Sequence, residues 1–235
     1  MNLESSFPHM VYINLGHRED RRHEVEYEFV KHDLHVRRLA GIKAAWLHDA
    51  RGYESKPRYA CGLTKCLAIR QGRLAGAAAV LMFEDDCVLH PDFRLRASQL
   101  TLPDDWGIFY FGCQHRERPV PLGNGLVRVK KAFDTHAFAV RAPYFGRVIN
   151  AMRGLSRGSP VRKIASDMEL AALHSEIPTY AAWPNLAWQA VSASGITGTT
   201  YSNYRADGSQ AVNEEILAGL DEEMEMIGPG CDQMA

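Results

Sequence analysis

The chain has 235 residues, of which 46% are hydrophobic and 23% are charged, and its formal net charge at pH 7 is -1. These values are typical of a folded globular protein with an ample core. The balanced charge argues against a dominant nucleic-acid or polyphosphate partner, although a local basic patch stays compatible with it.

Strand and helix patterns alternate through the first half of the chain. The apolar face of the first helix is supplied by Val25, Phe29 and Val30. That of the second is a stripe made of Leu63, Leu67, Ile69 or Arg70, and Leu74. The expected elements are a strand at 10–15, a helix after the polar turn at 16–22, a strand at 36–42, loops at 43–60, a helix at 61–75 and a strand at 78–83. This alternation favours an α/β fold with a mostly parallel central sheet flanked by helices.

The second half of the chain is less regular. Its expected elements are a helix from 90, a strand at 106–112, a surface loop at 114–126, a strand at 135–140, a helix at 143–152 and an acidic helix at 214–226. We find no repeat and no linker, which favours one domain over residues 1–235, with its core at about 10–200 and a less regular segment at 201–235.

The cysteines and the apolar runs bear on the compartment. The five cysteines are scattered and lack metal-ligand spacing, so reduced thiols in the cytoplasm are expected. No window approaches the roughly 20 apolar residues that cross a bilayer, and the first ten residues lack the pattern of a secretory signal. Peripheral attachment at the inner membrane face stays open.

Three carboxylates, Glu84, Asp85 and Asp86, follow directly after the most apolar strand. A strand that is apolar at every position is typical of the interior of a parallel sheet, and open α/β sheets bind ligands at the carboxyl ends of their strands. Adjacent carboxylates are costly there unless a cation lies among them, and Mg²⁺ or Mn²⁺ suits carboxylate oxygens and substrate phosphates. A solvated acidic turn is the alternative interpretation.

Alternation along an extended segment would direct Glu84 and Asp86 to one side and Asp85 to the other. Asp86 is therefore the expected direct metal ligand. Glu84 would contact the metal through water or hold a ribose, and Asp85 would contribute least.

Taken in order, the landmarks of the chain resemble glycosyltransferase family 25, which contains bacterial lipooligosaccharide galactosyltransferases and the collagen galactosyltransferases. The family usually shows Ser-His where this chain has Thr64-Lys65, so no role is carried over to that pair. The matching elements are Tyr12-Ile13-Asn14-Leu15, Arg18, Arg21-Arg22, Ala40-Gly41, Cys61-Gly62-Leu63, Glu84-Asp85-Asp86, Thr135-His136-Ala137-Phe138, Ser166-Asp167, the segment from Pro184 to Gln189, and Ser194-Gly195-Ile196.

The resemblance implies a GT-A fold, a Rossmann-like sheet that binds a nucleotide-sugar at the carboxyl ends of its strands. It implies a UDP-hexose donor (UDP-galactose or UDP-glucose), Mn²⁺ or Mg²⁺, and transfer with inversion to the hydroxyl of a glycan, a lipid-linked sugar or another acceptor. The positions it implicates in donor binding are Asn14, Leu15, Arg18, Arg22, Ala40, Gly41, Glu84, Asp85, Gln189 and Ser194.

Several of these positions also have a structural interpretation. Asn14 and Leu15 would lie against the base and ribose, and Arg18 and Arg22 against the diphosphate, because a guanidinium makes paired hydrogen bonds to phosphate. Alternatively, the arginines form a solvated helix start beside acidic neighbours. Gln189 and Ser194 would either line the donor pocket or be satisfied in the core or a loop.

Two residues are candidates for the chemistry of transfer. Inversion requires a general base for the acceptor hydroxyl, and Asp167 matches the late aspartate of the family; its alternative is a helix N-cap. His136 would bind the metal or the acceptor, or else be a hydrogen-bonded core residue.

Three rival functions stay open. A nucleotidyltransferase would use the same carboxylates and release pyrophosphate rather than UDP. A glycosyltransferase acting on modified DNA bases would bind DNA in a salt-sensitive way. An inactive nucleotide-sugar-binding domain would transfer no sugar.

Overall fold

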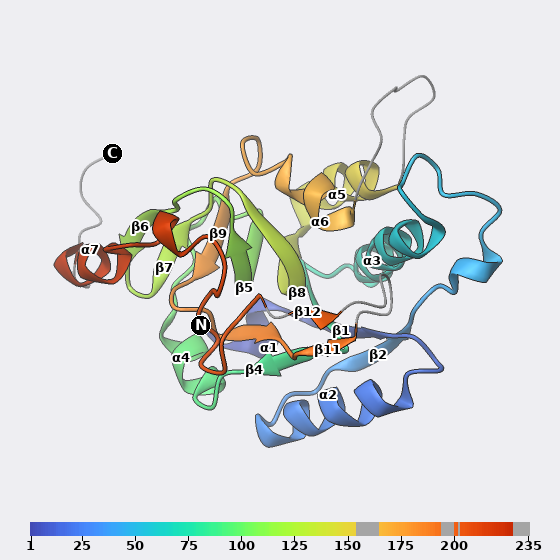
Figure 1. Ribbon diagram of the computed structural model, residues 1–235, viewed down its shortest axis with the longest axis horizontal. Coiled ribbons are helices and arrows are strands. Elements are labelled where there is room, and N and C mark those ends of the chain that lie inside the picture. The colour runs from blue at the N-terminus through green and yellow to red at the C-terminus, as the bar shows by residue number, and fades with distance from the viewer. Residues whose placement is uncertain (154–164, 194–199, 202, 228–235) are drawn as a thin grey trace.

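A computed structural model describes residues 1–153, 165–193, 200–201 and 203–227. Eight strands form its central sheet: β1 (His9–Asn14), β2 (Arg37–Ala40), β3 (Ala79–Glu84), β5 (Ile108–His115), β6 (Val120–Gly123), β7 (Leu126–Arg128), β8 (Ala132–Arg141) and β9 (Thr179–Ala182). Their order is β2-β1-β3-β8-β5-β9-β7-β6 (Figure 1). Strands β8 and β7 are antiparallel to both of their neighbours, and the other six run in one direction. The predicted α/β class with a mostly parallel sheet is confirmed.

Helices cover both faces of the sheet. One face packs against α1 (Leu3–Ser6), α2 (Glu19–Lys31) and α4 (Phe93–Gln99), and the other against α3 (Lys56–Leu74), α5 (Phe145–Met152) and α6 (Ser166–Ala171). Figure 1 shows α3, α5 and α6 above the sheet and α2 below it. None of the helices in the described residues is both long and apolar enough to cross a membrane.

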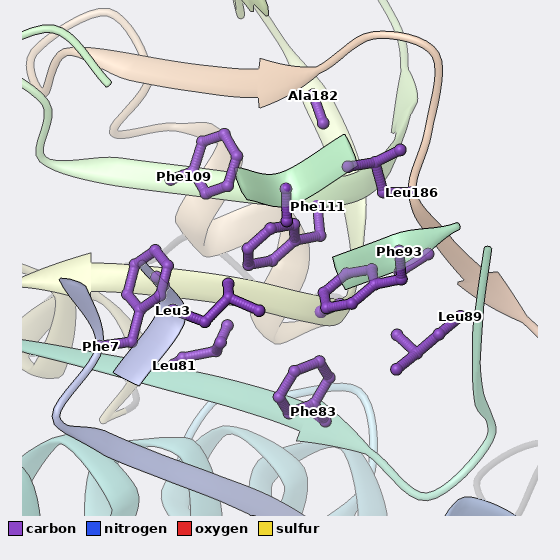
Figure 2. Packing of buried hydrophobic residues seen from close by; sticks show 14 of the residues in the cluster. Leu3, Phe7, Leu81, Phe83, Leu89, Phe93, Phe109, Phe111, Ala182 and Leu186 are labelled. Atoms are coloured by element: carbon purple, nitrogen blue, oxygen red, sulfur yellow. The ribbon is translucent and has the colours of Figure 1, made fainter. Parts of the chain in front are cut away.

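Alternate residues of β3 enter two separate cores, which is why this strand is apolar throughout. Leu81 and Phe83 join the cluster on the α2 face, and Val80 and Met82 join the cluster on the α3 face. Figure 2 shows the first cluster, in which Phe93 and Phe111 turn toward one another with ring centroids 5.0 Å apart.

The chain reverses its direction of winding between β1 and β3. It passes from β1 through α2 to β2 on one side, then through α3 to β3 on the other side of β1. Ligands of open α/β sheets bind in the crevice outside the carboxyl ends of the strands at such a switch point. Asn14 ends β1 and Glu84 ends β3, so the acidic triplet lies at this point.

Smaller elements complete the fold. Strand β10 pairs with β4 in antiparallel fashion and brings Gln189 opposite Cys87, next to the acidic triplet. The smaller elements are β4 (Cys87–Leu89), β10 (Ala187–Gln189), β11 (Ser192–Ala193), β12 (Thr200–Tyr201), the 3-10 turns Ala44–Trp46, Ala142–Tyr144 and Glu214–Ile216, and α7 (Leu220–Ile227).

The loop predicted at 114–126 is wrong. Strand β5 continues to His115, and β6 and β7 form a hairpin whose turn residues Gly123, Asn124 and Gly125 all have positive φ. Glycine and asparagine adopt that conformation readily, so the residues that suggested a loop make a tight hairpin turn.

Two helix predictions also need correction. Helix α3 begins at Lys56 rather than 61, because Pro57 fits the first turn of a helix. Of its predicted apolar stripe, Ile69 is completely buried but Leu74 is 88% exposed, and the rest of the buried face holds mostly small residues and Lys65. In α2, Val30 is 78% exposed, so only Val25 and Phe29 of the predicted face are buried.

Candidate functional site

Five polar side chains meet where β1 and β3 end: Asn14, Arg21, Arg38, Asp85 and Asp86, which we call the strand-end cluster. The Asn14 amide donates to Asp85 Oδ2 at 2.8 Å, and its Oδ1 accepts from Arg38 Nη2 at 2.8 Å. Arg21 Nη1 lies 3.1 Å from both Asp85 Oδ1 and Asp86 Oδ2. The hydrogen bonds and ion pairs of this cluster connect α2 with the ends of β1, β2 and β3.

The predicted alternation within the acidic triplet does not hold. Strand β3 ends at Glu84, and Asp85 and Asp86 form a turn before β4. The turn directs both aspartates to Arg21, whereas Glu84 points to Lys65 on α3. The period of two fails because it applies only while the backbone stays extended.

The charged form of Asp86 is disfavoured by its surroundings. Burial, followed by the charge of Glu84, raises the pKa of Asp86 to about 7, although Arg21 partly offsets both effects. Its Oδ1 is buried and has no hydrogen-bond partner among the described residues. A buried acceptor without a partner is costly and needs a ligand or a cation.

A divalent cation fits this arrangement if water and substrate supply most of its ligands. The described residues contain no group of three or more His, Cys, Asp or Glu side chains placed to hold a metal ion. Mg²⁺, however, is commonly bound through one or two carboxylates, with water and substrate phosphates as its remaining ligands. The unpartnered Asp86 Oδ1 suits that mode of binding and does not suit a site made of protein ligands alone.

A second group lies beside the first and is named here the lysine cluster: Lys65, Glu84, Thr135 and Ser166. Lys65 is 2% exposed, and its ammonium lies 2.8 Å from Glu84 Oε1 and 3.2 Å from Ser166 Oγ. Thr135 accepts from Lys65 and donates to Glu84 at 2.9 Å. Burial disfavours both charges, but the pair outweighs it, which raises the pKa of Lys65 and lowers that of Glu84.

Asp167 lies in the first turn of α6. The N-cap of this helix is Ala165, so the alternative that made Asp167 the cap is wrong. Asp167 Oδ2 instead accepts from the main-chain N–H of Asp134 at 3.3 Å. Its charge acts on both Lys65 and Asp134. The residue therefore borders the lysine cluster.

His136 is completely buried. Its Nε2 lies 3.0 Å from the carbonyl oxygen of Ala187, and its ring meets Tyr204 edge-on with centroids 5.3 Å apart. Burial lowers its pKa to about 4, so the ring is neutral at pH 7 and Nε2 is the donor. These contacts match the core interpretation of His136, and a role in binding stays a prediction.

Of the three arginines at the start of α2, only Arg21 points inward. Arg18 binds Asp20 at 2.7 Å, and Arg22 binds Glu26 at 3.0 Å with 42% of its side chain exposed. Arg21 precedes the buried Val25 by four residues, so helical spacing alone contained the signal for its burial. Contact of Arg18 and Arg22 with a diphosphate stays a prediction.

Of the remaining predicted positions, some lie next to the two clusters and others do not. Gly41 donates its N–H to the Asn14 carbonyl at 2.9 Å, and a side chain there would collide with Leu15. Ala40 ends β2 and is exposed. Gln189 lies beside the acidic triplet through β10. Ser194 lies outside the described residues.

No protein family model and no curated protein matches the sequence. Among similar solved structures is a glycosyltransferase involved in glycosylation of the major capsid of PBCV-1, with 10% identity, 74% of this chain and 93% of that chain covered, and a TM-score of 0.38. A mutant of the Drosophila galactosyltransferase 7 in complex with manganese, UDP-Gal and xylobiose has 11% identity, coverage of 88% and 76%, and a TM-score of 0.41. A UDP-glucose pyrophosphorylase complexed with UDP-glucose has 9% identity, coverage of 74% and 72%, and a TM-score of 0.41. The similar structures thus include both glycosyl- and nucleotidyltransferases.

Proposed function

We propose that this protein is a metal-dependent glycosyltransferase of family 25 type, which moves a hexose from UDP-galactose or UDP-glucose to a hydroxyl acceptor with inversion. The observation that carries the proposal is the buried, unpartnered Oδ1 of Asp86 at the switch point between β1 and β3. A cation would give Asp86 Oδ1 a partner, and the anionic diphosphate of a donor would bind that cation and the guanidinium groups beside the turn.

The strand-end cluster supports donor binding. Asp86 would hold Mn²⁺ or Mg²⁺, which, when bound, offsets the diphosphate charge as it departs. Arg21 holds Asp85 and Asp86 in place, and Asn14 links Asp85 to Arg38. The two aspartates are therefore already oriented before a donor arrives. Such preorganisation lowers the cost of ordering the site on binding.

The Asp167 carboxylate supports acceptor activation. In an inverting transfer the acceptor oxygen bonds to the anomeric carbon as the bond from that carbon to the diphosphate breaks, and the hydroxyl proton passes to a base. Lys65 neutralises Glu84, which leaves Asp167 as a carboxylate beside the lysine cluster without an ion-pair partner among the described residues. We assign the proton to Asp167.

Thermal unfolding with UDP, UDP-galactose and UDP-glucose, each with and without Mn²⁺, tests this function. A ligand at about 100 times its Kd raises the free energy of unfolding by about 2.7 kcal/mol. Release of UDP in the presence of an acceptor would support glycosyl transfer, whereas pyrophosphate from a nucleoside triphosphate would identify a nucleotidyltransferase. Binding without turnover would identify an inactive domain, and salt-sensitive binding of DNA would direct the acceptor search to nucleic acid.

Asp86→Asn is expected to abolish the part of the UDP-induced stabilisation that depends on Mn²⁺. The amide keeps the shape of the turn and removes the charge that suits a cation. Glu26→Gln, which removes a half-buried carboxylate paired with Arg22 on α2, is the control. An unchanged response of Asp86→Asn to Mn²⁺ would remove Asp86 from the metal site.

Arg18→Ala is expected to weaken UDP binding by about 1.5–3 kcal/mol, the range for a hydrogen bond to a charged group. Its guanidinium pairs with Asp20 and lies within the field of Asp85 and Asp86. Arg22→Ala is expected to have an effect of the same size, because Arg22 is also predicted to contact the diphosphate. Calorimetry with UDP measures both, and a change below about 0.5 kcal/mol in either variant would mark that arginine as part of a surface pair only.

A further inference from the structure

A bulge of three consecutive residues in β8 lies beside the site. Strand β8 pairs with β5 through Phe133 and Ala137, opposite Gln114 and Gly112, so three residues of β8 lie opposite one residue of β5. Bulges of this kind bend a strand and redirect its side chains, often next to active sites. The bulged residues are 134–136.

The first residue of the bulge, Asp134, has a φ of +66°. This left-handed conformation strains any residue with a Cβ atom, although asparagine and aspartate tolerate it better than most. Strain of this kind persists only where the surroundings hold it, and it concentrates at functional sites. The hydrogen bonds of Asp134 therefore indicate which groups this strained conformation positions.

The side chain of Asp134 accepts two hydrogen bonds, and its main-chain N–H donates one to a carboxylate. Its Oδ2 accepts from the Tyr204 hydroxyl at 2.8 Å and from Asn203 Nδ2 at 3.4 Å. Its main-chain N–H donates to Asp167 Oδ2 at 3.3 Å. A peptide N–H has its direction fixed by the backbone, so the left-handed conformation decides where this donor points.

The next residue of the bulge also forms hydrogen bonds within the site. Thr135 bonds both Lys65 and Glu84, so a single bulge contacts both the carboxylate that ends β3 and the Asp167 carboxylate in the first turn of α6. A bond to one oxygen of Asp167 leaves its other oxygen available to a hydroxyl. Holding a base in one orientation lowers the barrier to proton transfer.

We propose that Asp134 is a positioning residue: the left-handed bulge of β8 aims its main-chain N–H at Asp167 and so orients the acceptor base. The role of Asp167 as the base rests on the proposed function above. The side chain of Asp134 anchors the bulge through Tyr204 and Asn203.

Three substitutions at this position separate the backbone from the side chain. Asp134→Asn keeps an acceptor for Tyr204 and tolerates the left-handed conformation, so it should retain most of kcat. Asp134→Gly loses the anchor but adopts positive φ freely, so it should retain more of kcat than Asp134→Ala. Asp134→Ala loses the anchor and favours another conformation, and it should lower kcat by up to about 10²-fold with the donor KM unchanged, as expected of a displaced base.

Amide hydrogen exchange at residue 134 tests the contact without any reaction. Asp167→Ala removes the acceptor of this N–H and should speed its exchange, whereas Asp92→Ala, at an exposed carboxylate beside the start of α4, should not. This measurement stays informative if the protein transfers no sugar, so failure of the proposed function and failure of the positioning role are distinguishable.

Three results would overturn the inference. Loss of transfer in Asp134→Asn would make the carboxylate itself a reacting group. Equal kcat in Asp134→Gly and Asp134→Ala would mean that the left-handed conformation has no part in catalysis. Unchanged exchange in Asp167→Ala would mean that the N–H does not depend on Asp167.

Discussion

Asp167→Asn is expected to lower the turnover number by about 10²–10⁴-fold, the usual contribution of a general base. The substitution is nearly isosteric, and the amide oxygen of asparagine still accepts the Asp134 N–H, so the start of α6 keeps its contact. What is lost is the capacity to take up a proton. Steady-state kinetics with saturating acceptor should show the decrease in kcat, with the KM for the nucleotide-sugar nearly unchanged.

His136 supplies the comparison for this prediction. It is buried and neutral, and its Nε2 is used by the carbonyl of Ala187. A fully buried ring has no access to an acceptor hydroxyl, so His136→Gln should act mainly through stability. If Asp167→Asn kept its rate per folded molecule and His136→Gln lost it, the base would be the histidine.

The features that the sequence predicted depend on local patterns. Six apolar residues before Glu84 predicted both the buried strand β3 and its carboxylate-bearing end, because burial on both faces leaves no polar position in the strand. The apolar run at 10–15 predicted β1, which ends one residue earlier, at Asn14. These positions follow from short stretches of chain, and both lie at the switch point.

The residues that the sequence analysis missed depend on contacts between distant segments. Lys65 interacts with Thr135 and Ser166, which are 70 and 101 residues away. No local period predicts that β8 lies antiparallel beside β3 and carries Thr135 to that place. Arg21 is different, since its spacing from Val25 already assigned it to the buried face; the surrounding charges hid that signal.

Thr64 and Lys65 connect α3 to two other segments of the fold. Thr64 accepts from the Ile42 N–H at 3.0 Å and thereby ties α3 to the segment after β2. Lys65 pairs with Glu84 at 2.8 Å at the end of β3. The pair lowers the pKa of Glu84, so this carboxylate is ionised at neutral pH.

Lys65→Met is expected to lower the free energy of unfolding by about 3 kcal/mol or more, the cost of leaving one partner of a buried ion pair uncompensated. Methionine fills a similar volume, so the loss comes from Glu84, whose carboxylate retains only Thr135 as a partner in the lysine cluster. Urea unfolding measures the effect. Lys31→Met, which breaks an exposed pair with Glu28 at 3.4 Å, is the matched control and should cost less than about 1 kcal/mol.

The double variant Lys65→Met/Glu84→Gln separates charge from packing. Glutamine still accepts from Thr135, and with both charges removed there is no buried ion to solvate, so stability should recover by more than half of the loss in Lys65→Met. If the double variant were no more stable than Lys65→Met, the loss would come from packing at Ser166 and Thr135. Recovery of stability without recovery of transfer would mean that the charge pair also matters for the chemistry beside it, since the charges of Lys65 and Asp167 interact.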